Sequence, residues 1–109
     1  MFIFEGRKIN TDTDGYLKNS KEWCESMVYA LAKEENIILT KQHLEIIHFI
    51  REFYFEFNTS PSIRILVKVL AEKYGKAIGN SRYLYRLFPR GPTQQIAKLA
   101  GLPKPASCI

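Results

Sequence analysis

Proline and glycine interrupt the second half of this chain so often that only short helices fit between them. Residues 58–61 read Asn-Thr-Ser-Pro, residues 89–92 read Pro-Arg-Gly-Pro, and Gly101 precedes two further prolines. Proline cannot continue a helix, and glycine readily takes the left-handed conformation that ends one. A chain of 109 residues can bury one core and little more. We therefore expect a mainly α fold, a compact helical bundle formed as a single domain.

Capping residues and apolar spacing predict where the helices lie. A side-chain oxygen at the start of a helix can accept hydrogen bonds from its free amides, and such residues stand at Ser20, Thr40, Ser60 and either Asn80 or Ser81. The expected helices span residues 20–35, 40–57, 60–75, 80–87 and 93–100. The longest of them, 40–57, is expected at the centre of the bundle.

Both ends of the chain are expected to differ from this helical body. Short β-type runs flank Glu5-Gly6 and predict a small N-terminal β-hairpin. Two prolines, Pro103 and Pro105, exclude helix and predict an extended C-terminal arm. The expected division is a helical domain with its hairpin, residues 1–101, and the arm, residues 102–109.

Aromatic and small apolar residues provide the expected core. In the helix over residues 20–35, the buried face is expected to comprise Trp23, Met27, Ala30 and Leu31. The aromatic run of residues 53–57 is predicted to pack in the core rather than to stack nucleic-acid bases, because stacking platforms usually lie on sheets. Cys24 is expected to be a buried packing residue.

Charge divides the chain into two unlike halves. Residues 1–63 carry seven Lys or Arg against ten Asp or Glu, whereas residues 64–109 carry nine against one. This asymmetry favours an acidic partner for the second half, either a nucleic acid or an acidic protein surface. No apolar run approaches the roughly 20 residues that cross a bilayer, and no signal peptide is evident, so we expect a cytoplasmic protein without membrane contact.

The chain offers little machinery for catalysis of its own. His43 and His48 are five residues apart and point to different sides of one helix, so they are not expected to bind a metal ion together. We recognise no Gly-rich phosphate loop and no Ser/His/Asp group. We therefore expect neither a metal nor a cofactor.

Cys108, the next-to-last residue, is the candidate reactive group. A thiol near the end of an extended arm can enter the active site of another protein, and seven residues from Leu102 to Cys108 span at most roughly 23 Å. A thiolate can take up sulfur as a reversible persulfide. A chance thiol on a frayed terminus is the competing interpretation.

Residues 60–74 and 80–87 suggest a second function, a nucleic-acid-binding regulator. Two helices with a glycine-bearing break, the second of them basic, loosely fit a helix-turn-helix. The connection around residues 75–79 is longer than the usual three or four residues, which argues against direct DNA readout.

Three blocks of sequence resemble the DsrC/TusE family over essentially the whole chain. They are Phe55 with residues 58–61, residues 79–89 from Gly-Asn-Ser to Leu-Phe-Pro, and residues 91–105 together with the terminal Cys108-Ile109. The resemblance implies that Cys108 is the sulfur-bearing residue. DsrC proteins of dissimilatory sulfur metabolism have a second arm cysteine where this chain has Ala97, so the resemblance implies the TusE role rather than the sulfite-reductase role.

The same resemblance implies a sulfurtransferase that acts as a carrier in a sulfur relay. TusE-like proteins accept persulfide sulfur from the TusBCD complex and pass it to the thiouridylase MnmA, which makes 2-thiouridine at the wobble position of certain tRNAs. Contact with tRNA itself is then expected to be indirect. The expected docking face for these partners comprises Arg82, Arg86, Arg90, Lys98 and Lys104.

Overall fold

The computed structural model describes residues 2–105, so Cys108 lies outside the described residues. Its first element is the predicted hairpin, in which β1 (Phe2–Phe4) pairs antiparallel with β2 (Arg7–Ile9). Glu5 and Gly6 connect the strands with φ angles of 49° and 77°. Two consecutive positive φ angles match the right-handed twist of a two-residue hairpin, and glycine adopts such an angle without steric cost.

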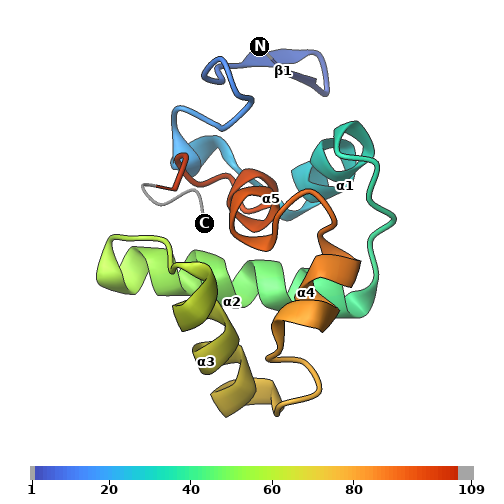
Figure 1. Cartoon of the computed structure of the whole chain (residues 1–109). Coiled ribbons are helices and arrows are strands. Elements are labelled where there is room, and N and C mark those ends of the chain that lie inside the picture. The colour runs from blue at the N-terminus through green and yellow to red at the C-terminus, as the bar shows by residue number, and fades with distance from the viewer. Residues whose placement is uncertain (1, 106–109) are drawn as a thin grey trace.

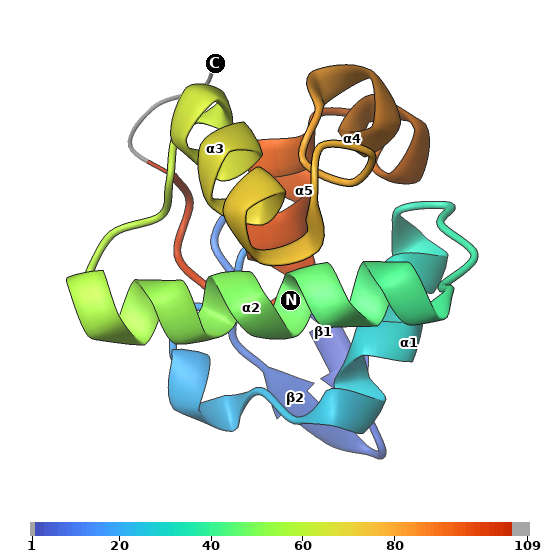
Figure 2. The same ribbon diagram turned by 90° about the horizontal axis from the view of Figure 1, so that it is seen from below.

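Between residues 2 and 105, five α-helices and one 3-10 turn follow the hairpin (Figures 1 and 2). Their bounds are η1 Ser20–Glu22, α1 Glu25–Glu34, α2 Lys41–Phe57, α3 Ile63–Tyr74, α4 Ser81–Leu87 and α5 Pro92–Leu99. The mainly α bundle with a small N-terminal hairpin is thus confirmed.

Two of the predicted caps are confirmed. The Thr40 side chain accepts from the His43 amide, and the His43 ring accepts in return from the Thr40 amide at 3.1 Å, which satisfies two free donors at the start of α2. The Asn80 side chain accepts from the Tyr83 amide at 2.8 Å and starts α4.

Two other helix starts were predicted wrongly. Residues 20–35 do not form one helix, because the chain becomes extended at Trp23 and Cys24 between η1 and α1. The helix expected from Ser60 begins instead after Ser62, whose side chain accepts from the Ile65 amide at 3.4 Å. In place of Ser20, the cap of η1 is Asn19, and α1 begins after Cys24 without a side-chain cap.

The centre of the bundle is α5, not α2 as predicted. This helix contacts α1, α2, α3 and α4, and Figure 1 shows it enclosed by them. Five of its residues after Pro92 are buried, among them the polar Thr93 and Gln95. A helix that is buried on most sides has apolar residues, or polar residues with hydrogen-bond partners, on nearly every face. In α2, by contrast, one stripe of side chains is buried and the opposite face is exposed to solvent.

The aromatic run 53–57 does not pack in the core as predicted. Phe55 and Phe57 are 55% and 56% exposed, and Phe53 and Tyr54 are only half-buried. The buried stripe of α2 consists of His43, Ile46, Ile47 and Ile50 and ends before this run begins. Of this run, Tyr54 packs against the core from a half-buried position, whereas Phe55 and Phe57 lie on the surface.

Candidate functional site

The C-terminal segment leaves α5 through a tightly bonded helix end. Gly101 has a φ of 68°, its amide donates to the Lys98 carbonyl at 3.2 Å, and the Leu102 amide donates to the Ala97 carbonyl at 2.9 Å. These bonds satisfy carbonyls that would otherwise lack partners at the end of a helix. Leu102 is fully buried and Pro105 is buried too.

Burial of Leu102 and Pro105 changes the reach that the sequence suggested. The segment is packed against the body as far as Pro105, so the span to Cys108 is counted from there rather than from Leu102. Three residues extend at most about 10 Å. The roughly 23 Å counted from Leu102 therefore overstates the reach.

Trp23 and Arg51 hold this base in place. The Trp23 indole donates to the Leu99 carbonyl at 2.8 Å, and the Arg51 guanidinium donates to the carbonyls of Ala100 at 2.6 Å and Ser20 at 3.0 Å. The guanidinium carbon also lies 4.2 Å from the centroid of the Trp23 ring, within the range of a cation–π contact. Partial burial lowers the pKa of Arg51. We call Trp23 and Arg51 the clamp.

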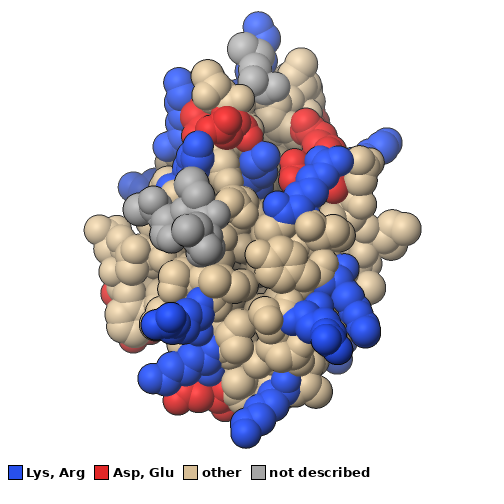
Figure 3. Space-filling view, viewed as in Figure 1, with Lys and Arg blue, Asp and Glu red and all other residues tan. Residues whose placement is uncertain are grey.

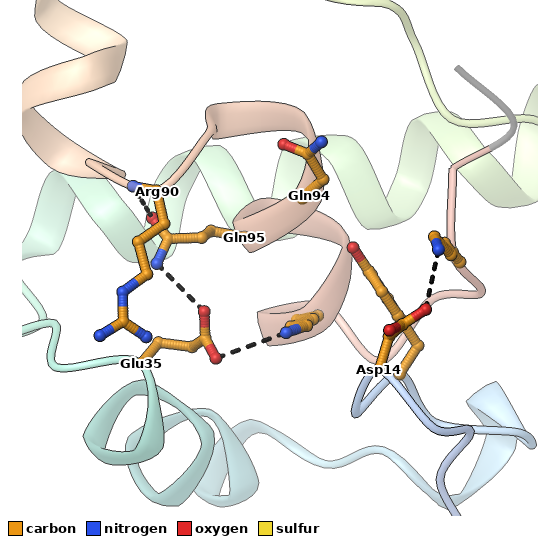
Figure 4. Close-up of a pocket in the computed structure, with 8 residues that line it drawn as sticks. Asp14, Glu35, Arg90, Gln94 and Gln95 are labelled. Atoms are coloured by element: carbon orange, nitrogen blue, oxygen red, sulfur yellow. Dashed lines mark hydrogen bonds and ion pairs between the residues drawn. The ribbon is translucent and has the colours of Figure 1, made fainter. Parts of the chain in front are cut away.

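Beside this base lies a polar pocket of about 340 Å³ (Figure 4). Residues from α5, from the turn before it, from the end of α1, from the loop after the hairpin and from the C-terminal segment line it. They are Asp14, Tyr16, Glu35, Arg90, Gln94, Gln95, Lys98 and Lys104. We call this the base pocket.

One wall of the base pocket is an internally bonded network. The buried Gln95 side chain donates to Glu35 at 3.1 Å and accepts from the Arg90 amide at 3.1 Å (Figure 4). Lys98 forms an ion pair with Glu35 at 3.6 Å and stacks over the Tyr16 ring at 5.3 Å. Because Gln95 satisfies both ends of its amide here, this wall is fixed rather than adaptable.

The opposite wall is closed by an ion pair between Lys104 and Asp14 at 2.7 Å. This pair joins the C-terminal segment to the loop after the hairpin. The hydrogen bond and charge of Lys104 lower the pKa of Asp14, with a smaller contribution from Lys98. A carboxylate whose pKa is lowered by folding stabilises the folded state at pH values above its ordinary pKa. That contribution is lost as the pH falls through the lower pKa of the folded state.

Replacing Lys104 by methionine is therefore expected to raise the pKa of Asp14 toward its ordinary value. The carboxyl carbon of Asp14 can be followed by NMR during an acid titration. Lys98→Met is the matched comparison and should raise the same pKa by less, since Lys98 acts only through its charge. Equal rises in the two variants would contradict the pairing.

The five predicted docking residues separate into two groups. Arg90, Lys98 and Lys104 line the base pocket, whereas Arg82 and Arg86 lie on α4. Lys98 and Lys104 are held by carboxylates of the chain itself. Arg82, Arg86 and Arg90 are exposed and form no ion pair with any residue between 2 and 105.

Positive charge dominates the surface around the two arginines of α4. Residues 63–87 carry six Lys or Arg and one Glu. Figure 3 shows their blue side chains gathered over α3 and α4. An acidic partner surface would be attracted to this side of the molecule.

The remaining candidate groups have structural partners. His43 donates through Nε2 to the Leu87 carbonyl at 2.8 Å, and His48 contacts Glu25 at 2.6 Å. Within residues 2–105, no three His, Cys, Asp or Glu side chains are grouped as metal ligands. Cys24 packs at the edge of the core as predicted, but it is only half-buried, and its sulfur lies 3.3 Å from the Ser26 hydroxyl.

Sequence reasoning missed most of the residues that build the base. The clamp and the carboxylates of Asp14 and Glu35 meet α5 from distant parts of the chain, and no local pattern marks them.

In the part of the chain that the structure covers, no helix is both long and apolar enough to span a bilayer.

Comparison with known proteins gives full-length matches. The family described as "DsrC like protein" matches residues 3–109. A protein of Photorhabdus laumondii subsp. laumondii named "Sulfurtransferase TusE" is 63% identical over 109 residues, covering 100% of this chain and 98% of that protein. Its namesake from Escherichia coli (strain K12) is 58% identical and covers 100% of both chains.

Solved structures agree with these matches. DsrC of Allochromatium vinosum has a TM-score of 0.89 at 42% identity, covering 99% of this chain and 96% of that one. The oxidized γ-subunit of the dissimilatory sulfite reductase (DsrC) from Archaeoglobus fulgidus has a TM-score of 0.84 at 37% identity, covering 96% of each chain. This chain therefore shares both sequence and fold with these proteins along its length.

Proposed function

This chain belongs to the DsrC-like protein family, and from that membership we propose that it is a sulfur carrier, a sulfurtransferase that holds persulfide sulfur on Cys108 and passes it on for the 2-thiolation of tRNA wobble uridine. The full-length similarity to proteins named sulfurtransferase TusE supports the carrier role. The cytoplasm suits this chemistry, because its reducing conditions keep a thiol free.

The proposed transfer needs no cofactor and no net oxidation. The Cys108 thiolate attacks the outer sulfur of a donor cysteine persulfide, a new sulfur–sulfur bond forms, and the donor leaves as a thiolate. An acceptor thiolate then attacks the outer sulfur on Cys108, which leaves as the original thiolate. One sulfur atom moves at each step, and the carrier returns to its starting state.

The observation that carries this proposal is the packed base of the C-terminal segment. The Leu102 amide, the clamp and the buried Pro105 hold residues 101–105 on the body, three positions before Cys108 in the sequence. A short tether from a fixed point restricts the volume that the thiol explores, which raises its effective concentration at a docked partner. A carrier that must present one sulfur atom to two different active sites benefits from both properties.

We further propose that Arg82, Arg86 and Arg90 dock the two partners, a TusBCD-like sulfur donor and an MnmA-like thiouridylase. These side chains are exposed and are not neutralised by carboxylates of residues 2–105. Lys98 and Lys104 attract a partner less, since their ion pairs must open first. Contact with tRNA is then made by the thiouridylase.

A reconstituted relay tests this function. Purified donor complex, carrier, thiouridylase and tRNA are mixed, and 2-thiouridine is measured by nucleoside mass spectrometry. Omitting the carrier should abolish most of the product. A carrier with Arg82→Glu, Arg86→Glu and Arg90→Glu should form it about tenfold more slowly at low salt, because charge complementarity governs the association rate.

The matched control reverses three exposed charges elsewhere, Arg7→Glu, Lys8→Glu and Lys18→Glu, and so has the same net charge. It should retain the wild-type rate. Equal losses in both variants would refute the docking face. Salt-sensitive binding of duplex DNA that depends on Arg82 and Arg86, together with a relay that runs without the chain, would favour the nucleic-acid regulator instead.

A further inference from the structure

The outward face of α2 combines aromatic rings with carboxylates in one stripe. Glu45, Phe49, Glu52, Phe53 and Glu56 follow one another at spacings of four, three, one and three residues, which places them on the same side of a helix. This side is opposite in character to the buried one, which is formed by isoleucines and His43. The stripe is therefore a second amphipathic surface beside the buried one, and Phe49 also packs partly against the core.

Helix α3 provides the other wall of a groove along this stripe. Val69, Glu72 and Lys73 face Phe53 and its neighbours across a hollow of about 410 Å³. The rings of Phe53 and Phe57 lie 4.7 Å apart between their centroids, and Phe57 is 56% exposed. A second hollow of about 350 Å³ shares Phe49, Glu52 and Lys73 with the first, so the groove continues toward the start of α2. We call the two together the α2–α3 groove.

The rim of the α2–α3 groove is acidic although the whole chain has a net charge of +5. Glu52, Glu56 and Glu72 form no ion pair or hydrogen bond with any residue between 2 and 105. The one lysine of the first hollow, Lys73, lies 5.4 Å above the Phe49 ring. Burial, and then the negative charges of Glu45 and Glu52, raise the pKa of Tyr74 at the edge of the groove.

We propose that the α2–α3 groove binds a basic amphipathic segment of another protein, one that inserts large apolar side chains between the phenylalanines and places Lys or Arg against the glutamates. Exposed aromatic side chains in a hollow are typical anchor sites of protein interfaces. The unpaired carboxylates supply the complementary charge. No residue of this groove lines the base pocket, so a partner held here leaves the C-terminal segment accessible.

The charge of the rim argues against other occupants. Phosphate groups of a nucleic acid and anionic lipid headgroups are repelled by three unpaired carboxylates. A second copy of this chain would have to present its basic α4 to the groove, and that head-to-tail contact builds a ring or an open filament rather than a two-fold dimer. A separate basic protein has neither difficulty.

A selection from a random peptide library tests the proposal, because the sequences of the peptides that bind are not assumed in advance. Peptides of about 14 residues, roughly four helical turns, are displayed on phage and panned on the wild-type chain. The enriched peptides should carry Leu or aromatic residues at helical spacing together with Lys or Arg. Their affinity is then measured by fluorescence anisotropy. We expect a loss of at least about tenfold in Phe57→Ser, and a similar loss in the triple variant Glu52→Gln, Glu56→Gln and Glu72→Gln.

Matched variants show whether these losses belong to the groove. Ile38→Ser removes a side chain that is 89% exposed outside it, and Glu5→Gln, Glu22→Gln and Glu34→Gln remove three carboxylates elsewhere. Both controls should bind the peptides as the wild type does. Failure to enrich any peptide, enrichment of acidic peptides, or equal binding by groove and control variants would each overturn the proposal. So would sedimentation showing self-association that Phe57→Ser abolishes.

Discussion

The variant Cys108→Ser is expected to take up no sulfur while keeping the wild-type fold. A serine hydroxyl cannot form a persulfide, and position 108 follows the last packed residue of the described chain, Pro105. After incubation with a persulfide donor, the intact mass of the wild type should rise by one sulfur atom, about 32 Da, and that of the variant should not change. In the reconstituted relay, the variant should form no 2-thiouridine.

The second cysteine provides the control for this experiment. Cys24 is half-buried, and Cys24→Ser should load and transfer sulfur as the wild type does. Its melting temperature and that of Cys108→Ser should both stay near the wild-type value. A full gain of mass in Cys108→Ser, lost only when Cys24 is also replaced, would assign the sulfur to Cys24 and contradict the carrier proposal.

Local sequence signals predicted those helices whose starts depend on local bonds. Thr40 and Asn80 each cap the helix that follows them, and both bonds join residues three positions apart. The chain was predicted wrongly where a distant contact decides its path. Trp23 was placed in a helix, but its indole bonds to the Leu99 carbonyl, 76 residues away, and the extended backbone at this point puts it there.

Predictions of which side chains are buried also failed where distant contacts decide the outcome. The buried side of α2 consists of isoleucines and His43, but the aromatic run at its end was assigned to the core although two of its rings are exposed. Only the path of α3 shows that Phe57 stays exposed. Similarly, the length of α2 suggested a central helix, whereas α5 is central because its few residues are enclosed on most sides.

Some residues of the candidate site could be predicted from local sequence, whereas others depend on contacts between distant parts of the chain. Cys108 stands out in the sequence through its position alone, and the basic residues of α4 stand out through their charge. The clamp could not be predicted, since Arg51 reads as one more charged residue on a surface helix until its bonds to the Ala100 and Ser20 carbonyls are seen. The sequence also could not show that Lys98 and Lys104 are paired with carboxylates while the arginines are not. Only the fold brings Glu35 to Lys98 and Asp14 to Lys104.

Substitution of Gly101 by alanine is expected to have a large effect on stability, because this residue joins the clamp to the C-terminal segment. An added Cβ would overlap Cδ1 of Trp23 and lie 2.7 Å from its Cβ and Cγ. The positive φ of 68° adds a cost of about 1 kcal/mol for any residue with a side chain. Trp23 cannot move aside without losing its bond to Leu99 and its stacking on Arg51. With an overpacking cost of about 2 kcal/mol, we expect a loss of about 3 kcal/mol in the free energy of unfolding, measured by urea denaturation.

Gly6 separates the two contributions, since its φ is also positive, at 77°, and an added Cβ there meets nothing within 4 Å. Gly6→Ala should therefore show the backbone cost alone, about 1 kcal/mol. In a background with Trp23→Gly the three obstructing atoms Cβ, Cγ and Cδ1 are absent, so Gly101→Ala should cost no more than Gly6→Ala, which gives a coupling of about 2 kcal/mol between positions 23 and 101. Additive effects of the two substitutions would mean that Trp23 does not pack on Gly101. The base of the C-terminal segment would then not be held by the clamp, and the fixed tether on which the carrier mechanism depends would lose its support.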